Sequence, residues 1–348
     1  MGTVRAMADD PDMRVPGLLR DAGELGWFAL FVPEEFGGGT VSGDPMRDAV
    51  IVAEERGRRV QPGPFVTTNV VSFALVQAGR PEQQGAWLPR LASGEVTAAW
   101  AISDGSGAPV AGALKARDGD AGLVLSGTAG LVSDGTTAGL LLASALRDAG
   151  DVVHCLVPAD TPGVNLTRLS GLDITREFVE VSFNDVRVPR DAVLDAGGSP
   201  PLLDQLIDIA ATLSVADSVG AMSRLLELTV AYAKDRTAFG RPIGSFQALK
   251  HLLADASLAV EVSAAGTTAA AHAFGDRSPA ASEIASIAKA YVGDAGISVV
   301  QACQQVHGGI GFTWEHDLHF YLRRLAVDRV LYGDPSWHRE RICRIHGL

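Results

Sequence analysis

The chain has 348 residues, of which 47% are hydrophobic and 20% are charged, and its formal net charge is −12. This composition is typical of a globular protein and excludes a disordered one. A chain of this length can form one large domain or two to three small ones without disulfides. The acidic balance argues against a nucleic-acid-binding protein, although a local group of arginines can still bind an anion.

The cysteines and the N-terminus both indicate a cytoplasmic protein. The cysteines are odd in number and include no CxxC pair, which is typical of a reducing compartment (Cys155, Cys303 and Cys343). The N-terminal sequence MGTVRAMADDPDMRV has acids where a signal peptide needs an apolar run. No apolar stretch is expected to be long enough to span a membrane.

The apolar pattern changes twice along the chain and predicts three segments. Residues 1–95 show helical spacing, as in Leu18, Ala22 and Leu25, and predict an α-helical N-terminal domain. Residues 96–195 alternate with period two, as in Val179 and Val181, and their frequent turns predict a small β-barrel or sandwich. Residues 196–348 return to helical spacing and predict a helical bundle, in which the small apolar run 264–273 is expected to be buried on most sides. The fold class expected is therefore α+β.

The first motif lies between two helical patterns and reads R-T-A-F-G-R-P-I-G-S-F-Q over residues 236–247. Arg236 supplies a forked cation that suits phosphate oxygens, and Phe239 offers a flat apolar face for a ring. Gln247 can both donate and accept a hydrogen bond near the start of the next helix. The alternative is a tight corner whose arginine is simply solvated.

A second motif, at residues 305–315, contains three glycines within four residues. After Gln305, the glycines Gly308, Gly309 and Gly311 allow a backbone to approach a ligand closely and to present N–H groups to an anion. The alternative is a helix C-cap followed by a turn.

Together the two motifs resemble the acyl-CoA dehydrogenase family, and two further phrases support the resemblance. The phrase F-N-D-V-R-V-P at residues 183–189 is similar to the end of that family's middle domain, and residues 26–38 are similar to its N-terminal loop. The resemblance covers nearly the whole chain. It implies an α-helical N-terminal domain, a middle β-barrel and a C-terminal four-helix bundle.

The resemblance also implies a cofactor, a reaction and a shared site. In that family a carboxylate removes the α-proton of an acyl-CoA thioester, and the β-hydrogen leaves as hydride to FAD. Members form tetramers in which each FAD lies between the middle domain of one subunit and the bundle of its neighbour. The resemblance places Arg236 at the flavin pyrophosphate, Phe239 and Gln247 beside the adenosine, and Gln305, Gly308 and Gly309 in the same half-site.

Both positions at which the family carries its base lack a carboxylate here. The phrase Y-E-G-T reads Tyr332-Gly333-Asp334-Pro335, and the alternative base position on the first bundle helix reads Ala210. A carbon-bound proton does not leave at a useful rate without a positioned base. Asp334 is a weak substitute candidate, for which a turn role before Pro335 is favoured, and the catalytic residue is otherwise unknown.

The middle-domain half of the flavin site is also reduced. The aromatic that would cover the flavin ring is Leu131, and a family lysine is Ala129. The family's Thr-Glu phrase followed by Gly-Ser-Asp reads S-D-G-S-G here, at residues 103–107. A flavin can still dock on Ser133, with fewer contacts.

These departures suggest a hetero-oligomer. The chain resembles the base-lacking subunit of two-subunit, heterotetrameric dehydrogenases of actinobacterial type, which act on bulky CoA thioesters such as steroid side-chain acids. A related partner would supply the base and the middle-domain half. The alternative is a non-catalytic structural partner of an active dehydrogenase. No metal site is expected, because His316 and His319 lack an apparent third ligand, and Asp208 is expected on a solvated face.

Overall fold

The structure is a computed structural model, and it describes residues 2–9, 15, 17–195 and 201–348. By its internal contacts the chain forms two compact units. One, the sheet unit, comprises residues 11–49 and 62–210. The other, the helical unit, comprises residues 1–10, 50–61 and 211–348. The division at residues 95 and 195 stays a prediction made along the sequence.

The N-terminal part of the sheet unit is helical, as expected. It contains α2 (Leu18–Glu24), the start of α3 (Pro45–Arg58), α4 (Phe65–Ala78) and α5 (Pro81–Ala92). Helix α4 is buried over most of its length, including its polar Thr68 and Asn69. The Asn69 amide donates to the carbonyls of Trp27 and Phe65 at 2.9 and 2.8 Å, which satisfies its donors inside the unit.

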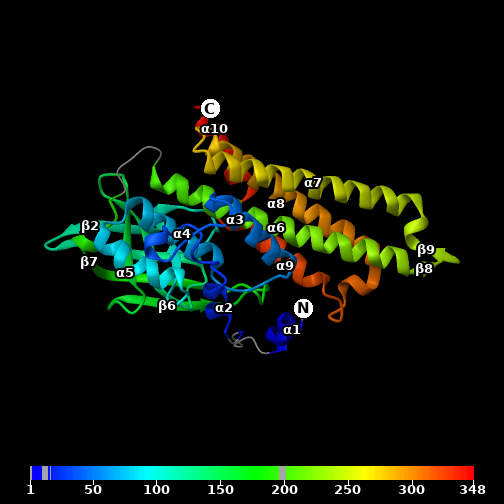
Figure 1. Cartoon of the computed structure of the whole chain (residues 1–348), viewed down its shortest axis with the longest axis horizontal. Coiled ribbons are helices and arrows are strands. Elements are labelled where there is room, and N and C mark those ends of the chain that lie inside the picture. The colour runs from blue at the N-terminus through cyan, green and yellow to red at the C-terminus, as the bar shows by residue number, and fades with distance from the viewer. Residues whose placement is uncertain (1, 10–14, 16, 196–200) are drawn as a thin grey trace. The chain divides into compact units, whose positions relative to one another are not determined.

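A seven-stranded mixed sheet follows these helices (Figure 1). Its strands are β1 (Thr97–Ala101), β2 (Leu114–Gly119), β3 (Gly122–Ser133), β4 (Ala138–Arg147), β5 (Val152–Pro158), β6 (Val164–Leu169) and β7 (Phe178–Pro189). Strand β4 pairs with β5 on one side, and on the other side with β1 along its first part and with β2 at its end. Beyond β2 the order continues with β3, β7 and β6. Inward side chains from β1 to β5 and β7 share one apolar core, including Leu125, Leu141 and Phe183.

The sheet differs from the expected barrel in its pairing. Among the described residues, β6 pairs only with β7, and β5 pairs with β4 and otherwise forms only the single bridge between Cys155 and Val193. Closure of a barrel requires the two edge strands to pair, which removes both edges. The middle segment is therefore confirmed as a sheet around one core, without a closed ring of paired strands.

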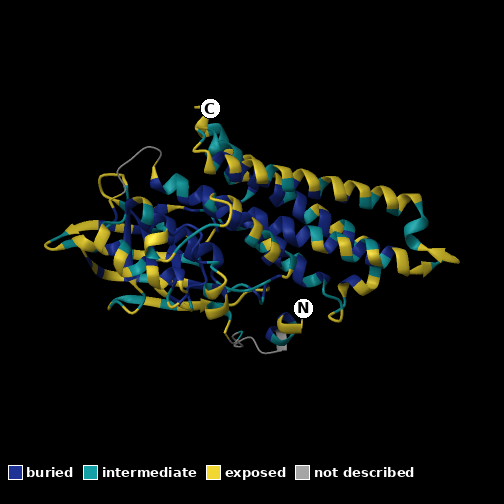
Figure 2. Cartoon of the chain, viewed as in Figure 1, coloured by how far each residue is buried: buried dark blue, intermediate teal, exposed yellow. Residues whose placement is uncertain are grey.

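The helical unit contains long helices and a short hairpin. They are α1 (Gly2–Asp9), the main part of α6 (Leu202–Asp235), β8 (Thr237–Ala238), β9 (Arg241–Pro242), α7 (Gln247–Gly275), α8 (Ala281–His307), α9 (Leu318–Val330) and α10 (Pro335–Ile345). The helical C-terminal domain is thus confirmed. Figure 2 shows exposed residues along the outer side of α7, where Leu258 and Val262 are 64% and 42% exposed. The expectation that residues 264–273 are buried on most sides is wrong, because Ala265 and Ala269 are exposed on that same side.

The end of α3 crosses α6 at two glycines. A Cβ at Gly57 would lie 1.8 Å from the Asp217 carbonyl oxygen, and a Cβ at Gly220 would lie 1.8 Å from the Glu54 carbonyl oxygen. Only glycine permits backbones to approach this closely. The segment 50–61 is consequently part of the helical unit, although it lies far from the rest of that unit in sequence.

A buried ion pair reinforces the same crossing. Arg324 of α9 is fully buried, and its Nε donates to Asp217 Oδ1 at 2.8 Å while one terminal nitrogen donates to Oδ2 at 2.9 Å. That terminal nitrogen also donates to the Gln61 carbonyl at 2.7 Å. The pair therefore links α9, α6 and the residues after α3.

Helix α6 corrects one expectation from the sequence. Among the described residues it is a helix long and apolar enough to cross a membrane by length and composition. However, 94% of its most apolar stretch is buried inside the protein. This burial is typical of a core helix.

Candidate flavin half-site

Arg236 lies where α6 ends and the β8–β9 hairpin begins. Its backbone N–H donates to the Tyr232 carbonyl at 2.8 Å, and its own carbonyl accepts from the Ile243 N–H at 2.8 Å. The side chain is exposed, and no described residue forms an ion pair or hydrogen bond with its guanidinium. A backbone that is fixed while the cation is free leaves that cation available to an outside anion.

Phe239 at the hairpin tip is 95% exposed and has a left-handed φ of 53°. Its ring meets the edge of Phe246 at 6.1 Å, and the Arg241 guanidinium lies over Phe246 at 4.1 Å. Gln247 is exposed and is the first residue of α7. An aromatic ring held open on a tight turn indicates contact with something outside the chain.

The glycine motif begins at the C-terminus of α8. Gly308 has φ 61° and ψ −141°, and neither Gly308 nor Gly309 would bring a Cβ within 4 Å of another residue. At Gly311, by contrast, a Cβ would lie 3.0 Å from His307 Cβ, so packing explains that glycine. Gln305 is exposed on the preceding turn. Gly308 and Gly309 therefore face open space, as a ligand that approaches the backbone would require.

His307 connects the two motifs through its contacts with α6 and α8. Its ring stacks on Tyr232 of α6 with centroids 4.5 Å apart, and its Nδ1 donates to the Cys303 carbonyl at 2.9 Å. Arg236 follows Tyr232 by one helical turn and Gly308 directly follows His307, so both lie at the same end of the helical unit (Figure 1). His307 Nε2 is buried without a hydrogen-bond partner among the described atoms. No sequence pattern predicted the contact between Tyr232 and His307.

The two positions at which the family carries its base have different surroundings. Ala210 is fully buried. Asp334 caps α10, since its Oδ1 accepts from the Trp337 N–H at 2.8 Å, which agrees with the favoured turn role. Asp208 is only 3% exposed, so the expectation of a solvated face was wrong.

The other half-site residues lie in the sheet unit. Ser133 is at the end of β3 opposite Phe178 and is 6% exposed. The loop 103–107 folds onto itself, because Ser103 Oγ accepts from the N–H groups of Gly105 and Gly107 at 3.1 Å each. A Cβ at Gly130 would lie 2.8 Å from Gly105 Cα. This loop therefore lies directly against β3 just before Leu131.

The histidines after the glycine motif are used in local contacts. His316 Nδ1 accepts from the Leu318 N–H at 3.1 Å, and the His319 ring stacks on Trp314 at 4.5 Å. Burial lowers the pKa of both imidazoles below the ordinary value of 6.5. Within the described part of the chain, no three His, Cys, Asp or Glu side chains gather as a metal ion would require.

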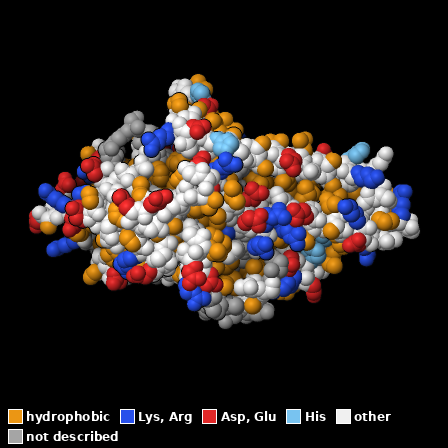
Figure 3. Space-filling model, in the orientation of Figure 1, with side chains coloured by type: hydrophobic (Ala, Val, Ile, Leu, Met, Phe, Trp, Pro, Cys, Tyr) orange, Lys and Arg blue, Asp and Glu red, His pale blue; other side chains and the backbone are white. Residues whose placement is uncertain are grey.

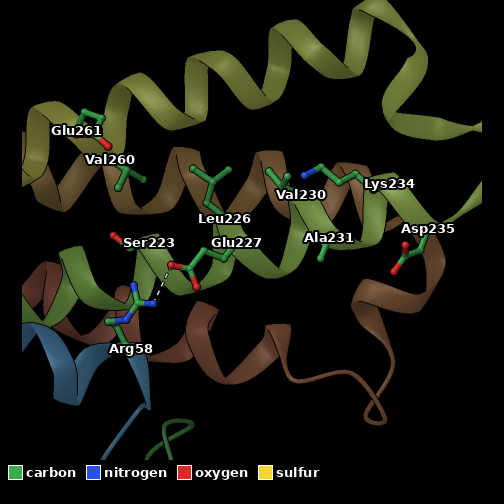
Figure 4. Close-up of a pocket in the computed structure, with 10 residues that line it drawn as sticks. All are labelled: Arg58, Ser223, Leu226, Glu227, Val230, Ala231, Lys234, Asp235, Val260 and Glu261. Atoms are coloured by element: carbon green, nitrogen blue, oxygen red, sulfur yellow. Dashed lines mark hydrogen bonds and ion pairs between the residues drawn. The ribbon is translucent and has the colours of Figure 1, made fainter.

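A groove of about 660 Å³ runs beside the same corner and was not anticipated from the sequence (Figure 4). Leu226, Val230 and Val260 form its apolar wall, and Arg58 at one end donates to Glu227 at 2.8 Å. Its other end is formed by Lys234 and Asp235, the residues directly before Arg236.

The surface shows no extended basic area on the face in Figure 3, where the Lys and Arg side chains of the described residues are interspersed with Asp and Glu. This distribution agrees with the net charge of −12. Non-specific binding to a polyanion requires a continuous basic surface.

Comparisons with known proteins agree with these observations. The acyl-CoA dehydrogenase C-terminal domain model matches residues 203–346, and the N-terminal domain model matches residues 3–95. The chain is 32% identical to acyl-CoA dehydrogenase IpdE2 of Mycolicibacterium smegmatis over 92% of this chain and 84% of that protein. It is 34% identical to acyl-CoA dehydrogenase FadE34 of Mycobacterium tuberculosis over 91% of this chain but 40% of that protein.

Solved structures show the same fold. The Tcur3481-Tcur3483 steroid acyl-CoA dehydrogenase G363A variant superposes with a TM-score of 0.87 at 28% identity, covering 99% of this chain and 92% of that one. Butyryl-CoA dehydrogenase from Megasphaera elsdenii gives 0.87 at 21% identity, covering 99% and 94%. The chain therefore belongs to the acyl-CoA dehydrogenase family, whose members are flavin-dependent oxidoreductases that use FAD.

Proposed function

We propose that this chain is one subunit of an acyl-CoA dehydrogenase that oxidises an acyl-CoA thioester to the 2,3-enoyl-CoA and shares its FAD site with a related partner subunit. The main support is the contrast inside one chain. An open corner with a free cation is present, whereas Gly333 and Ala210 stand where a base would be. The cytoplasm is the expected location.

The corner binds the diphosphate and adenosine end of FAD in this proposal. Arg236 pairs with the diphosphate, and the N–H groups at Gly308 and Gly309 contact the same anion. Phe239 lies against the adenosine ring, while Gln247 and Gln305 supply polar contacts at its edge. FAD, when bound, supplies the hydride acceptor.

The partner completes the site. Because loop 103–107 lies against Gly130, the sheet unit of this chain offers the flavin ring few groups besides Ser133. The partner therefore contributes the middle-domain half and the carboxylate that removes the α-proton. The similar Tcur3481-Tcur3483 steroid dehydrogenase is named for two components and for a steroid, which favours a heterotetramer and a bulky CoA thioester for this chain as well.

The flavin content of purified protein tests the proposal. The chain should bind no flavin alone and should bind it when co-expressed with a related subunit that carries the glutamate. Arg236→Ala should weaken FAD binding about 10- to 100-fold, because a charge-assisted hydrogen bond contributes roughly 1.5–3 kcal/mol. Arg224→Ala is the matched control, since Arg224 is an exposed arginine of α6 that pairs with Glu227 at 3.0 Å.

The outcomes separate the proposal from its alternatives. A homotetramer of this chain with full flavin and dehydrogenase turnover would refute the shared site. Flavin that binds the co-expressed pair but is unaffected by Arg236→Ala would remove the corner from the site. A stable pair that binds no flavin would instead support the structural-partner role, which the missing base also favours.

A further inference from the structure

We infer that the corner between α9 and α10 is closed around Gly333 by α10 itself, so that any side chain there, and hence a restored base, forces α10 or the loop to move and destabilises the chain. Position 333 matters for catalysis only if the family's chemistry applies, so this step rests on the proposed function. The geometry of the corner depends only on this chain.

The backbone and its neighbours both exclude a side chain at this position. Gly333 has φ +102°, which L residues rarely adopt. A Cβ there would lie 2.6 Å from Trp337 Cε3 and 2.9 Å from His338 Nε2. Both distances are shorter than real Cβ contacts, so a ring or the loop would have to move.

The rings are held by bonds within the same corner. His338 is fully buried, and its Nε2 donates to the Tyr332 carbonyl at 3.0 Å, the residue next to Gly333. The backbone of Trp337 is fixed by its hydrogen bond to Asp334. Pro335, at the start of α10, is buried so close to α8 that a Cβ at Gly293 would lie 2.9 Å from Pro335 Cγ. Movement of α10 would therefore disturb its packing on α8 as well.

Shape rather than charge excludes the carboxylate. The buried Lys289 ammonium donates to the carbonyls of Asp328 and Arg329 at 2.7 and 3.2 Å, at the end of α9. It interacts electrostatically with both Asp334 and His338, so a cation is already near position 333. The clash arises at Cβ, which alanine and glutamate share, so a neutral methyl group should be excluded as well as a glutamate.

Thermal unfolding of the isolated chain tests this inference. Gly333→Ala should lower the melting temperature more than Gly150→Ala does. Gly150 also has a left-handed φ, +88°, but a Cβ there would meet nothing within 4 Å, so its substitution measures backbone strain without a clash. Combining Gly333→Ala with Trp337→Ala should cost less than the sum of the two single changes, because the nearest clashing atom is then absent.

Three results would each overturn the inference. The first is a loss of melting temperature for Gly333→Ala no larger than that for Gly150→Ala, and the second is strict additivity with Trp337→Ala. The third is a Gly333→Glu chain that melts at the wild-type temperature. Since the melting measurements need neither flavin nor partner, a failed flavin experiment would refute the proposed function without affecting this test.

Discussion

The buried pair between Asp217 and Arg324 allows a stability prediction of definite size. The two side chains are 4% and 0% exposed, and they share two hydrogen bonds of 2.8 and 2.9 Å. Asp217→Ala removes the carboxylate that pairs with a buried guanidinium, and breaking a buried ion pair in this way typically costs about 3–5 kcal/mol. At roughly 2–4 °C per kcal/mol, the melting temperature should fall by about 6–20 °C.

Circular dichroism of the purified chain during heating measures this loss. Glu227→Ala is the control, because its pairs with Arg58 and Arg224 lie at the surface and should contribute at most about 1 kcal/mol. Replacing both Asp217 and Arg324 by apolar residues of similar size should restore much of the stability. An Asp217→Ala protein that melts within a degree or two of the wild type would refute the reasoning.

Three further predictions concern pH and local packing. Burial lowers the pKa of His154 to about 4 and that of His338 to about 3. Below pH 6.5, the ordinary pKa of histidine, the unfolded chain therefore binds more protons than the folded chain. The free energy of unfolding should therefore have its full value above pH 6.5 and fall as the pH drops towards 4, by up to about 1.4 kcal/mol per pH unit and group. Denaturant unfolding at several pH values measures this dependence, and a flat profile would contradict it. Gly220→Ala should cost well over 1 kcal/mol in a urea titration because its Cβ would meet the Glu54 carbonyl, whereas Gly85→Ala, with open space around it in α5, should be neutral or slightly stabilising. Asp334→Ala should cost about 1 kcal/mol through loss of the cap, while Asp334→Asn should keep both the stability and, in the assembled enzyme, the turnover; a large loss of turnover would make Asp334 the base.

Local patterns predicted the elements well because they act over a few residues. The period-two alternation around Val181 became β7, and the breakers at Gly240 and Pro242 became the hairpin that exposes Arg236. The absence of a carboxylate at positions 210 and 333 could also be seen in the sequence, because it required only an alignment of short segments with the family's pattern.

Features that depend on contacts distant in sequence were not predicted. Asp208 was placed on a solvated face because helical spacing gives a residue's direction but not what covers that face. The stack of Tyr232 on His307 joins residues 75 positions apart, and single residues of these types carry no pattern. The barrel was inferred from the spacing of short strands and turns and from the family resemblance, whereas closure depends on which edge strands pair.

The glycine crossing of α3 and α6 affects how the protein can be cut and made. Residues that touch there are separated by about 160 positions, so this contact closes late and at high entropic cost during folding. A recombinant fragment beginning near residue 196 would lack residues 50–61, and the face of α6 that carries Gly220 would be exposed to solvent. The helical unit is therefore assembled from separate stretches of chain, and during synthesis the end of α3 cannot form this contact until α6 has been made.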